Sequence, residues 1–156
     1  MTEWTLKDGE RLDDLVRDGM RLIQRPDQFC FSVDSVLLAH YVKPKAKDRI
    51  ADLGTGTGVI SLLVSALGGR DITAFEVNPV MADLARRNIA GNGKEDRIHV
   101  VECDYRKVNE RFPSGSFSLV LANPPYREMG TGKMSMLEGV ASASYEMNAS
   151  LTDVFK

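Results

Sequence analysis

The residues best suited to chemistry stand together toward the carboxyl end of the chain: Asn123, Pro124, Pro125 and Tyr126. They directly follow an apolar run at 117–122, which is typical of a buried strand. The two prolines cannot continue a sheet because neither donates a ladder hydrogen bond, so the strand must end here. The four residues are therefore expected at the carboxyl end of a strand, where open α/β sheets bind ligands.

This tetrapeptide suits methylation of a planar amine or amide nitrogen. Such a nitrogen is a poor nucleophile because its lone pair is delocalised. The side-chain oxygen of Asn123 and the carbonyl of Pro124 could each accept one N–H and draw the lone pair out of conjugation. Tyr126 could stack on the ring that carries the amine, as aromatic side chains do on unstacked bases. The same residues also fit a plain strand-ending turn with a surface tyrosine, since Asn-Pro is an ordinary turn signal.

A second motif reads Asp52, Leu53, Gly54, Thr55, Gly56, Thr57 and Gly58. A short buried strand is predicted over 50–53 and an apolar helix over 59–67, with the glycines in the turn between them. Glycines permit a tight turn and let a ligand approach the backbone closely. Their spacing differs from the Gly-x-Gly-x-x-Gly motif of dinucleotide binders, and the carboxylate of Asp52 suits a cationic ligand better than a pyrophosphate.

Two further acidic residues follow predicted strands. A strand over 71–76 ends in Glu76, about twenty residues after the glycine turn, where a ribose-binding carboxylate is expected. Asn78 then caps a predicted helix. A third strand over 98–102 leads to Asp104. Taken alone, either acid also fits a solvated strand end, and Asp104 fits it more readily than Glu76.

Together these residues resemble the class I S-adenosylmethionine-dependent methyltransferases, with one matching feature after each of four successive strands. The resemblance implies S-adenosyl-L-methionine as cofactor, S-adenosyl-L-homocysteine as product, and no metal. It implies that the glycine turn holds the methionine part, Glu76 the ribose hydroxyls and Asp104 the adenine amine. The implied cofactor-binding residues are Ser32, Asp34, Asp52, Gly54, Thr55, Gly56, Gly58, Glu76, Val77, Asp104, Tyr105 and Asn123. The implied catalytic residues are Asn123, Pro124, Pro125 and Tyr126.

The segment at 31–39 is similar to the one that precedes the cofactor motif in bacterial tRNA adenine-N6 methyltransferases, in particular those acting on a valine tRNA beside the anticodon. There it closes over the methionine end of the cofactor, a part that Ser32 or Asp34 could take. Simple capping of a helix over 33–42 by Ser32 explains the same residues. Before this helix, a strand over 20–25 is expected to turn and return at 29–31.

The implied fold is α/β: a Rossmann-like three-layer sandwich with a mostly parallel sheet, strand order beginning 3-2-1-4, and a small N-terminal β-hairpin and helix. One domain is expected over 1–156. Its parts would be a hairpin and helix segment at 1–48, a cofactor-binding core at 49–126, a flexible substrate loop at 127–147 and the start of a helix at 148–156. Because the family's sheet has three further strands, the chain is expected to be C-terminally truncated. The strand at 117–122 would then offer an edge for self-association.

Composition adds little to these motifs. A net charge of -2 does not indicate a nucleic-acid binder, although basic residues cluster locally at 17–25 and 43–49. Neither a membrane span nor a signal peptide is recognisable. The two cysteines are far apart in sequence and suggest a reduced cytoplasm, with no zinc-like pattern.

The predicted function is adenine-N6 methylation of tRNA, by in-line displacement at the sulfonium methyl. A release-factor type protein-glutamine N5 methyltransferase and an rRNA guanine-N2 methyltransferase share the tetrapeptide and remain alternatives. The former typically carries an extra helical N-terminal domain, for which roughly fifty residues before the glycine turn leave little room. A DNA adenine enzyme would need a target-recognition region. An inactive nucleotide- or RNA-binding module is the non-enzymatic alternative.

Overall fold

The computed structural model describes residues 3–28 and 30–123, which form an α/β structure. The predictions for Pro124, Pro125, Tyr126, the loop at 127–147 and the helix start at 148–156 lie outside the described residues. The elements in chain order are β1 (Arg11–Asp14), β2 (Arg21–Gln24), α1 (Val33–Tyr41), β3 (Arg49–Leu53), α2 (Val59–Ala66), β4 (Asp71–Glu76), α3 (Pro79–Gly91), β5 (Ile98–Glu102), the 3₁₀ helix η1 (Tyr105–Glu110) and β6 (Leu119–Ala122).

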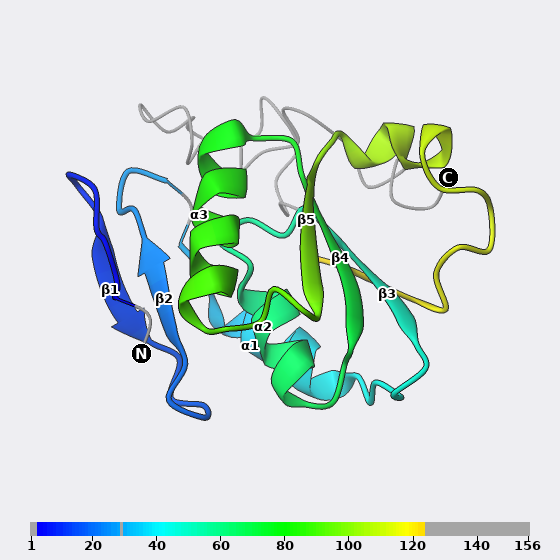
Figure 1. Cartoon of the computed structure of the whole chain (residues 1–156), viewed down its shortest axis with the longest axis horizontal. Helices are drawn as coiled ribbons and strands as arrows, with labels where there is room; N and C mark the ends of the chain where they lie inside the picture. The colour runs from blue at the N-terminus through cyan, green and yellow to red at the C-terminus, as the bar shows by residue number, and fades with distance from the viewer. Residues whose placement is uncertain (1–2, 29, 124–156) are drawn as a thin grey trace.

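The central sheet has four parallel strands in the order β5-β4-β3-β6 (Figure 1), which confirms the predicted order 3-2-1-4. In its register Leu53 lies opposite both Phe75 and Ala122. Glu76 likewise lies opposite Glu102. The carboxyl ends of all four strands therefore meet along one edge, as parallel pairing requires.

Each strand of the sheet divides its side chains between two apolar cores. Ile50 and Ile72 pack with α1 and α2, whereas Ala51 and Phe75 pack with residues of the opposite face. On that second face Phe117 packs against Phe75, with ring centroids 6.0 Å apart. The strand itself is shorter than predicted: β6 begins at Leu119 and not at 117, because the chain bends at Ser118.

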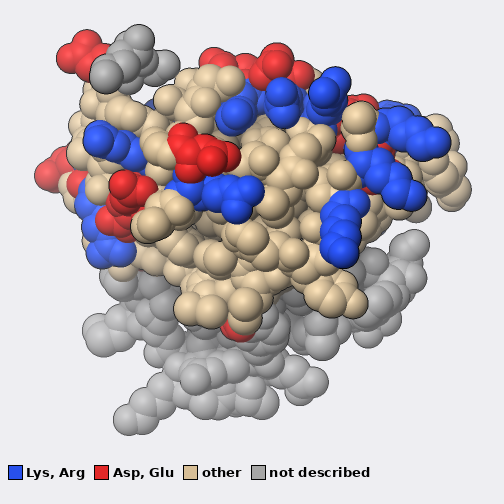
Figure 2. Space-filling view, turned by 90° about the horizontal axis from the view of Figure 1, so that it is seen from below, with Lys and Arg blue, Asp and Glu red and all other residues tan. Residues whose placement is uncertain are grey.

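The loops that precede the strands lie at the opposite edge from the carboxyl ends. They include the basic run at 43–49 before β3 and the loop at 92–97 before β5. The face seen from below in Figure 2 carries Lys and Arg side chains interspersed with Asp and Glu. Arg49, for example, pairs with Asp71 at 3.5 Å. The basic run therefore lies away from the edge where the predicted site residues gather.

The N-terminal hairpin exists and contains the predicted strand at 20–25 as β2, but the strand that pairs with it is not the predicted one. β1 pairs antiparallel with β2, with Leu12 opposite Ile23, and the turn lies between these two strands. Val16 (φ 52°), Asp18 (φ 51°) and Gly19 (φ 68°) adopt left-handed conformations in this turn. The expected return at 29–31 is wrong, since Cys30 and Phe31 belong to no strand.

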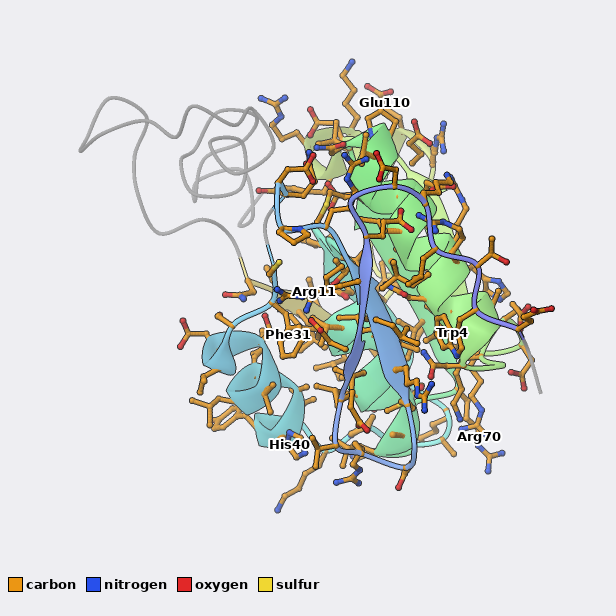
Figure 3. All side chains as sticks on the ribbon, turned by 90° about the vertical axis from the view of Figure 1, so that its left-hand side faces the viewer. Trp4, Arg11, Phe31, His40, Arg70 and Glu110 are labelled. Atoms are coloured by element: carbon orange, nitrogen blue, oxygen red, sulfur yellow. The ribbon has the colours of Figure 1, made fainter. Side chains whose placement is uncertain are left out.

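Two asparagines, Asn88 in α3 and Asn92 at the C-cap of this helix, occupy the edge of β2 that β1 leaves open. The side-chain oxygen of Asn88 accepts a hydrogen bond from the Ile23 amide at 2.6 Å, and its side-chain nitrogen donates one to the Ile23 carbonyl at 3.0 Å. Asn92 does the same with Arg21, at 3.0 and 2.7 Å. Four residues advance a helix by about 6 Å and two residues advance a strand by nearly 7 Å, so the two spacings match. The hairpin consequently lies against α3 (Figure 3).

Asn88 also reaches the glycine turn, because its amide nitrogen donates to the Thr57 carbonyl at 3.0 Å. Its side chain is completely buried and joins β2, α3 and the turn. On the same helix, a Cβ added at Gly91 would collide with the ring of Trp4, so the N-terminal segment covers the end of α3.

We expect Asn88→Ala to lower the free energy of unfolding by about 3 kcal/mol, because it leaves three buried backbone groups without partners. Asn92→Ala is the matched control and should cost about 1 kcal/mol, since its site is partly exposed. Urea denaturation of both variants measures the difference. Equal losses for the two would contradict this account of Asn88.

Candidate functional site

The carboxyl edge of the sheet brings the predicted site residues together. Hydrogen bonds continue past the strand ends: the Thr55 amide donates to the Phe75 carbonyl at 2.9 Å, and the Cys103 amide to the Glu76 carbonyl at 3.0 Å. The glycine turn, Glu76 and Asp104 thus follow neighbouring strands. Asn123, directly after β6, lies on the other side of the turn. What each residue binds stays a prediction.

The glycine turn needs its glycines for two different reasons. Gly54 (φ 70°), Gly56 (φ 58°) and Gly58 (φ 86°) all adopt left-handed conformations that side chains rarely take. A Cβ at Gly58 would also lie 3.6 Å from Ala85, so this glycine lets α3 pack closely on the turn. A Cβ at Gly54 would meet only the Tyr105 ring, at 3.9 Å. The space beside Gly54 can therefore admit a ligand.

Asp52 is a completely buried carboxylate beneath this turn. Its Oδ2 atom accepts hydrogen bonds from the hydroxyls of Thr55 and Ser61, both at 2.7 Å. Its Oδ1 atom is buried and has no hydrogen-bond partner in the described structure. Burial raises the pKa of the carboxyl group, and the two hydroxyls oppose that rise. A buried oxygen in need of a donor is a feature that a cationic or N–H-bearing ligand would satisfy.

Glu76 holds the turn from the neighbouring strand. One carboxylate oxygen accepts the Gly56 amide at 2.9 Å and the other accepts the Asn78 amide at 3.2 Å. Burial raises the pKa of Glu76, the two amides oppose this, and the charge of Asp52 adds to the rise. A carboxylate has about four lone-pair positions, so acceptor capacity remains for two hydroxyls. The next residue, Val77, presents an apolar side chain that is 42% exposed.

Asp104 has partners within the protein that the sequence did not indicate. It caps η1 by accepting the Arg106 amide at 3.0 Å, and its carboxylate binds the Arg106 guanidinium. The guanidinium lowers the pKa of Asp104. An adenine amine would have to share this carboxylate with Arg106. The neighbouring Tyr105 packs against the apolar cluster around Phe75.

The first turn of α1 carries the remaining predicted residues. Ser32 occupies the N-cap position, as expected, but its side chain makes no capping hydrogen bond. Asp34 is exposed. Ser35, which sequence reasoning did not single out, is buried and accepts a hydrogen bond from Asn123 Nδ2 at 3.0 Å. This contact connects the helix to the end of β6.

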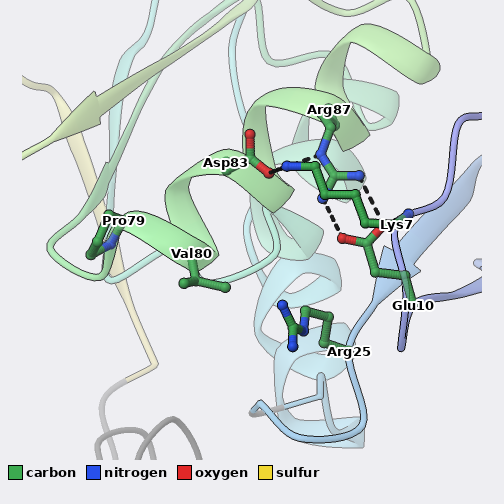
Figure 4. Close-up of a pocket in the computed structure, with 7 residues that line it drawn as sticks. All are labelled: Lys7, Glu10, Arg25, Pro79, Val80, Asp83 and Arg87. Atoms are coloured by element: carbon green, nitrogen blue, oxygen red, sulfur yellow. Dashed lines mark hydrogen bonds and ion pairs between the residues drawn. The ribbon is translucent and has the colours of Figure 1, made fainter.

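A separate hollow of about 270 Å³ lies between the N-terminal segment and the first half of α3 (Figure 4). Most of its charged side chains pair with one another: Lys7 with Asp83 at 2.9 Å, and Arg87 with Glu10. Arg25 pairs with Asp27 outside the hollow. None of the predicted site residues lines it. It is therefore distinct from the site at the carboxyl edge.

Within residues 3–28 and 30–123, no cluster of three or more His, Cys, Asp or Glu side chains could hold a metal ion. No helix in this part of the chain is long and apolar enough to cross a membrane.

A family model described as the methyltransferase small domain matches residues 20–149. The chain belongs to this family. Membership agrees with the glycine turn, the buried acids and the strand order described above.

Two curated relatives of this chain carry the names of tRNA-modifying enzymes. A tRNA1(Val) (adenine(37)-N6)-methyltransferase of Shewanella amazonensis is 35% identical over 73% of this chain and 48% of its own length. A protein of the same name from Bacteroides thetaiotaomicron is 34% identical over 60% of this chain and 39% of its own length. The chain thus spans about half the length, or less, of these relatives.

Solved structures agree with the fold. A S-adenosylmethionine-dependent methyltransferase of Agrobacterium tumefaciens matches 78% of this chain and 41% of its own, with a TM-score of 0.56 and 20% identity. A tRNA (m1A58) methyltransferase of Aquifex aeolicus matches 67% of this chain and 40% of its own, with a TM-score of 0.54 and 21% identity. At these identities the likeness concerns the fold alone.

Asp52 generates a prediction about stability and pH. A raised folded-state pKa means that the stabilising contribution of this carboxyl is present at acidic pH, below the unfolded pKa, and is lost as pH rises through the folded value. Asp52→Asn keeps an oxygen for Thr55 and Ser61 and removes the buried charge. We expect it to raise the free energy of unfolding at pH 7 by about 1 kcal/mol.

The measurement is denaturant unfolding at several values between about pH 4 and pH 7. As pH rises over this range, the free energy of unfolding of Asp52→Asn should fall less than that of the parent. The remaining fall is due to Glu76. Asp34→Asn, at an exposed carboxylate, should follow the parent curve. A loss of stability in Asp52→Asn at pH 7 would contradict the reading of this carboxylate as costly to bury.

Proposed function

We propose that this chain acts in S-adenosyl-L-methionine-dependent methylation of adenine N6 in a tRNA. One observation carries the proposal: the glycine turn lies at the carboxyl edge of the sheet between two groups of residues. Asp52 and Glu76 hold it on one side, and Asn123 lies on the other. Support also comes from the family of the chain and from the names of its curated relatives.

The residues present fit this cofactor. When bound, S-adenosyl-L-methionine supplies a methyl group on a cationic sulfur. Asp52 Oδ1 is a buried acceptor that receives no hydrogen bond from the described residues, and a Cβ added at Gly54 would meet only the Tyr105 ring among them. Glu76 retains acceptor capacity for the two ribose hydroxyls, and the exposed Val77 offers an apolar surface for a purine. In this proposal Ser32 and Asp34 close over the methionine end.

Asn123 would handle the substrate amine. Its position one residue beyond β6 places it next to the residue that follows β3, namely Gly54. Its side-chain oxygen would accept one N–H of the amine, with the Pro124 carbonyl as second acceptor and Tyr126 stacked on the base. Orientation of the nitrogen lone pair would provide most of the rate enhancement. No general base is needed, because the methylated ammonium is acidic enough to lose its proton to solvent.

Radiolabelled methyl transfer to three acceptors separates the alternative substrates. We expect label in total RNA, recovered as N6-methyladenine, and none in DNA or in a release factor. Label in the release factor would favour glutamine N5 methylation instead. Label recovered as N2-methylguanine would favour the rRNA alternative.

We expect Glu76→Ala to weaken binding of S-adenosyl-L-homocysteine at least tenfold, which corresponds to about 1.4 kcal/mol, because it removes the proposed ribose acceptor. Titration calorimetry measures the affinity. Glu102→Ala is the matched control, because Glu102 ends the adjacent strand and pairs with Arg86 at the surface. Unchanged affinity in the folded Glu76 variant would overturn the assignment.

We expect Asn123→Ala to lower methyl transfer by on the order of a hundredfold, because an aimed hydrogen-bonding group at the reacting atom is lost. Its affinity for S-adenosyl-L-homocysteine should stay within about threefold of the parent value. Asn92→Ala, an asparagine remote from the sheet edge, should retain the parent rate. Transfer by Asn123→Ala at the parent rate would exclude the proposed activation.

Self-association is a further proposal. Among the described residues β6 pairs with β3 along one edge only, and Val120 on β6 is 51% exposed. An unpaired strand edge can pair with another chain. Size exclusion coupled to light scattering should give a mass that rises with concentration. A monodisperse monomer at all concentrations would exclude this association.

A further inference from the structure

The amide group of Asn123 has a fixed partner outside the sheet. Its Nδ2 atom donates to the Ser35 hydroxyl at 3.0 Å, which joins residues 88 positions apart in the sequence. Ser35 is only 3% exposed, and its own amide donates to the Ser32 carbonyl at 3.1 Å. Helix α1 in turn packs against α2, with Ala39 completely buried. The serine hydroxyl is therefore held by rigid secondary structure.

An asparagine side chain has two chemically opposite ends. The oxygen only accepts hydrogen bonds and the nitrogen only donates them, yet the two ends have nearly the same shape. The torsion that exchanges them is soft and has roughly two equivalent positions. Accepting an N–H from a substrate amine requires the oxygen end. A flipped amide would present its own N–H groups to that amine and repel it.

We propose that Ser35 is a positioning residue that holds the Asn123 amide with its oxygen toward the substrate amine. The contact at Nδ2 assigns the donor end to α1, so the oxygen lies at the end of the amide that faces away from Ser35. This inference rests on the proposed function, since it concerns the same amine. It gives the first turn of α1 a second task besides the one proposed for Ser32 and Asp34.

The contact is tested directly by nuclear magnetic resonance of protein labelled with ¹⁵N-asparagine. The side-chain amide signals of Asn123 are those that disappear in Asn123→Asp. In Ser35→Ala these signals should shift, and their hydrogen exchange should accelerate at least about fivefold, because a hydrogen bond is lost. Ser35→Thr keeps a hydroxyl and should restore slow exchange.

Ser65→Ala is the matched control. Ser65 is another buried serine, on α2, and its hydroxyl donates to the Leu62 carbonyl at 2.7 Å, remote from Asn123. This variant should leave the Asn123 signals unchanged. Unchanged Asn123 signals in a folded Ser35→Ala protein would overturn the proposal, whatever the activity of the chain.

Methyl-transfer kinetics test the consequence. Ser35→Ala should lower kcat about tenfold while KM for RNA and the affinity for S-adenosyl-L-homocysteine stay within about threefold. Ser35→Thr should recover at least half of the parent kcat. In an Asn123→Ala background, Ser35→Ala should cause no further loss, because the serine acts through the asparagine.

The outcomes separate this inference from the proposed function. A parent protein that transfers methyl groups to RNA, with an equally active Ser35→Ala variant, would overturn the positioning role alone. A parent protein that methylates none of the three acceptors would overturn the proposed function. The amide signals would then decide by themselves whether Ser35 orients Asn123.

Discussion

Two buried carboxylates hold the glycine turn, and the arrangement of the site depends on them. Asp52 binds the hydroxyls of Thr55 and Ser61 from below, while Glu76 accepts the Gly56 amide from the next strand. Burying charge beside neutral partners is unfavourable, and burial raises the pKa of both groups. The fold thus keeps two unfavourably buried carboxylates at the edge where, in the proposed function, a ligand with N–H and O–H donors would complete their hydrogen bonding.

Helix α3 connects the glycine turn to the N-terminal hairpin. Its first turn follows directly from Glu76 through the Asn78 cap, and its last turn carries Asn88. That one side chain binds the Ile23 backbone and the Thr57 carbonyl together. The small hairpin is therefore fixed to the same turn that the carboxylates hold, although hairpin and turn are far apart in sequence. A two-stranded hairpin is marginally stable alone, so this attachment gives it a defined place.

The first turn of α1 plays the corresponding part at the end of β6, on the same face of the sheet as α3. Ser32 and Asp34 remain accessible, whereas Ser35 is buried against Asn123. In the proposed function one helical turn would thus touch both the methionine end of the cofactor and the group that receives the substrate amine. Because both groups are supported by the same helical turn, the position of the cofactor would be fixed relative to that of the substrate amine.

The sequence by itself determined the glycine turn and the presence of Glu76 and Asn123 at strand ends, and its resemblance to a known family supplied the strand order. Strand periodicity and turn residues are local, so they can be read in order along the chain. Only the tertiary structure decided that β1 and not residues 29–31 pairs with β2, that Arg106 binds Asp104, and that Ser35 meets Asn123. The second and third outcomes each rest on an individual side-chain hydrogen bond or ion pair, and the first is accompanied by the hydrogen bonds of Asn88 and Asn92 to the other edge of β2. A hydrogen bond of this kind leaves no periodic pattern in the sequence, because it depends on where the packed elements place one atom.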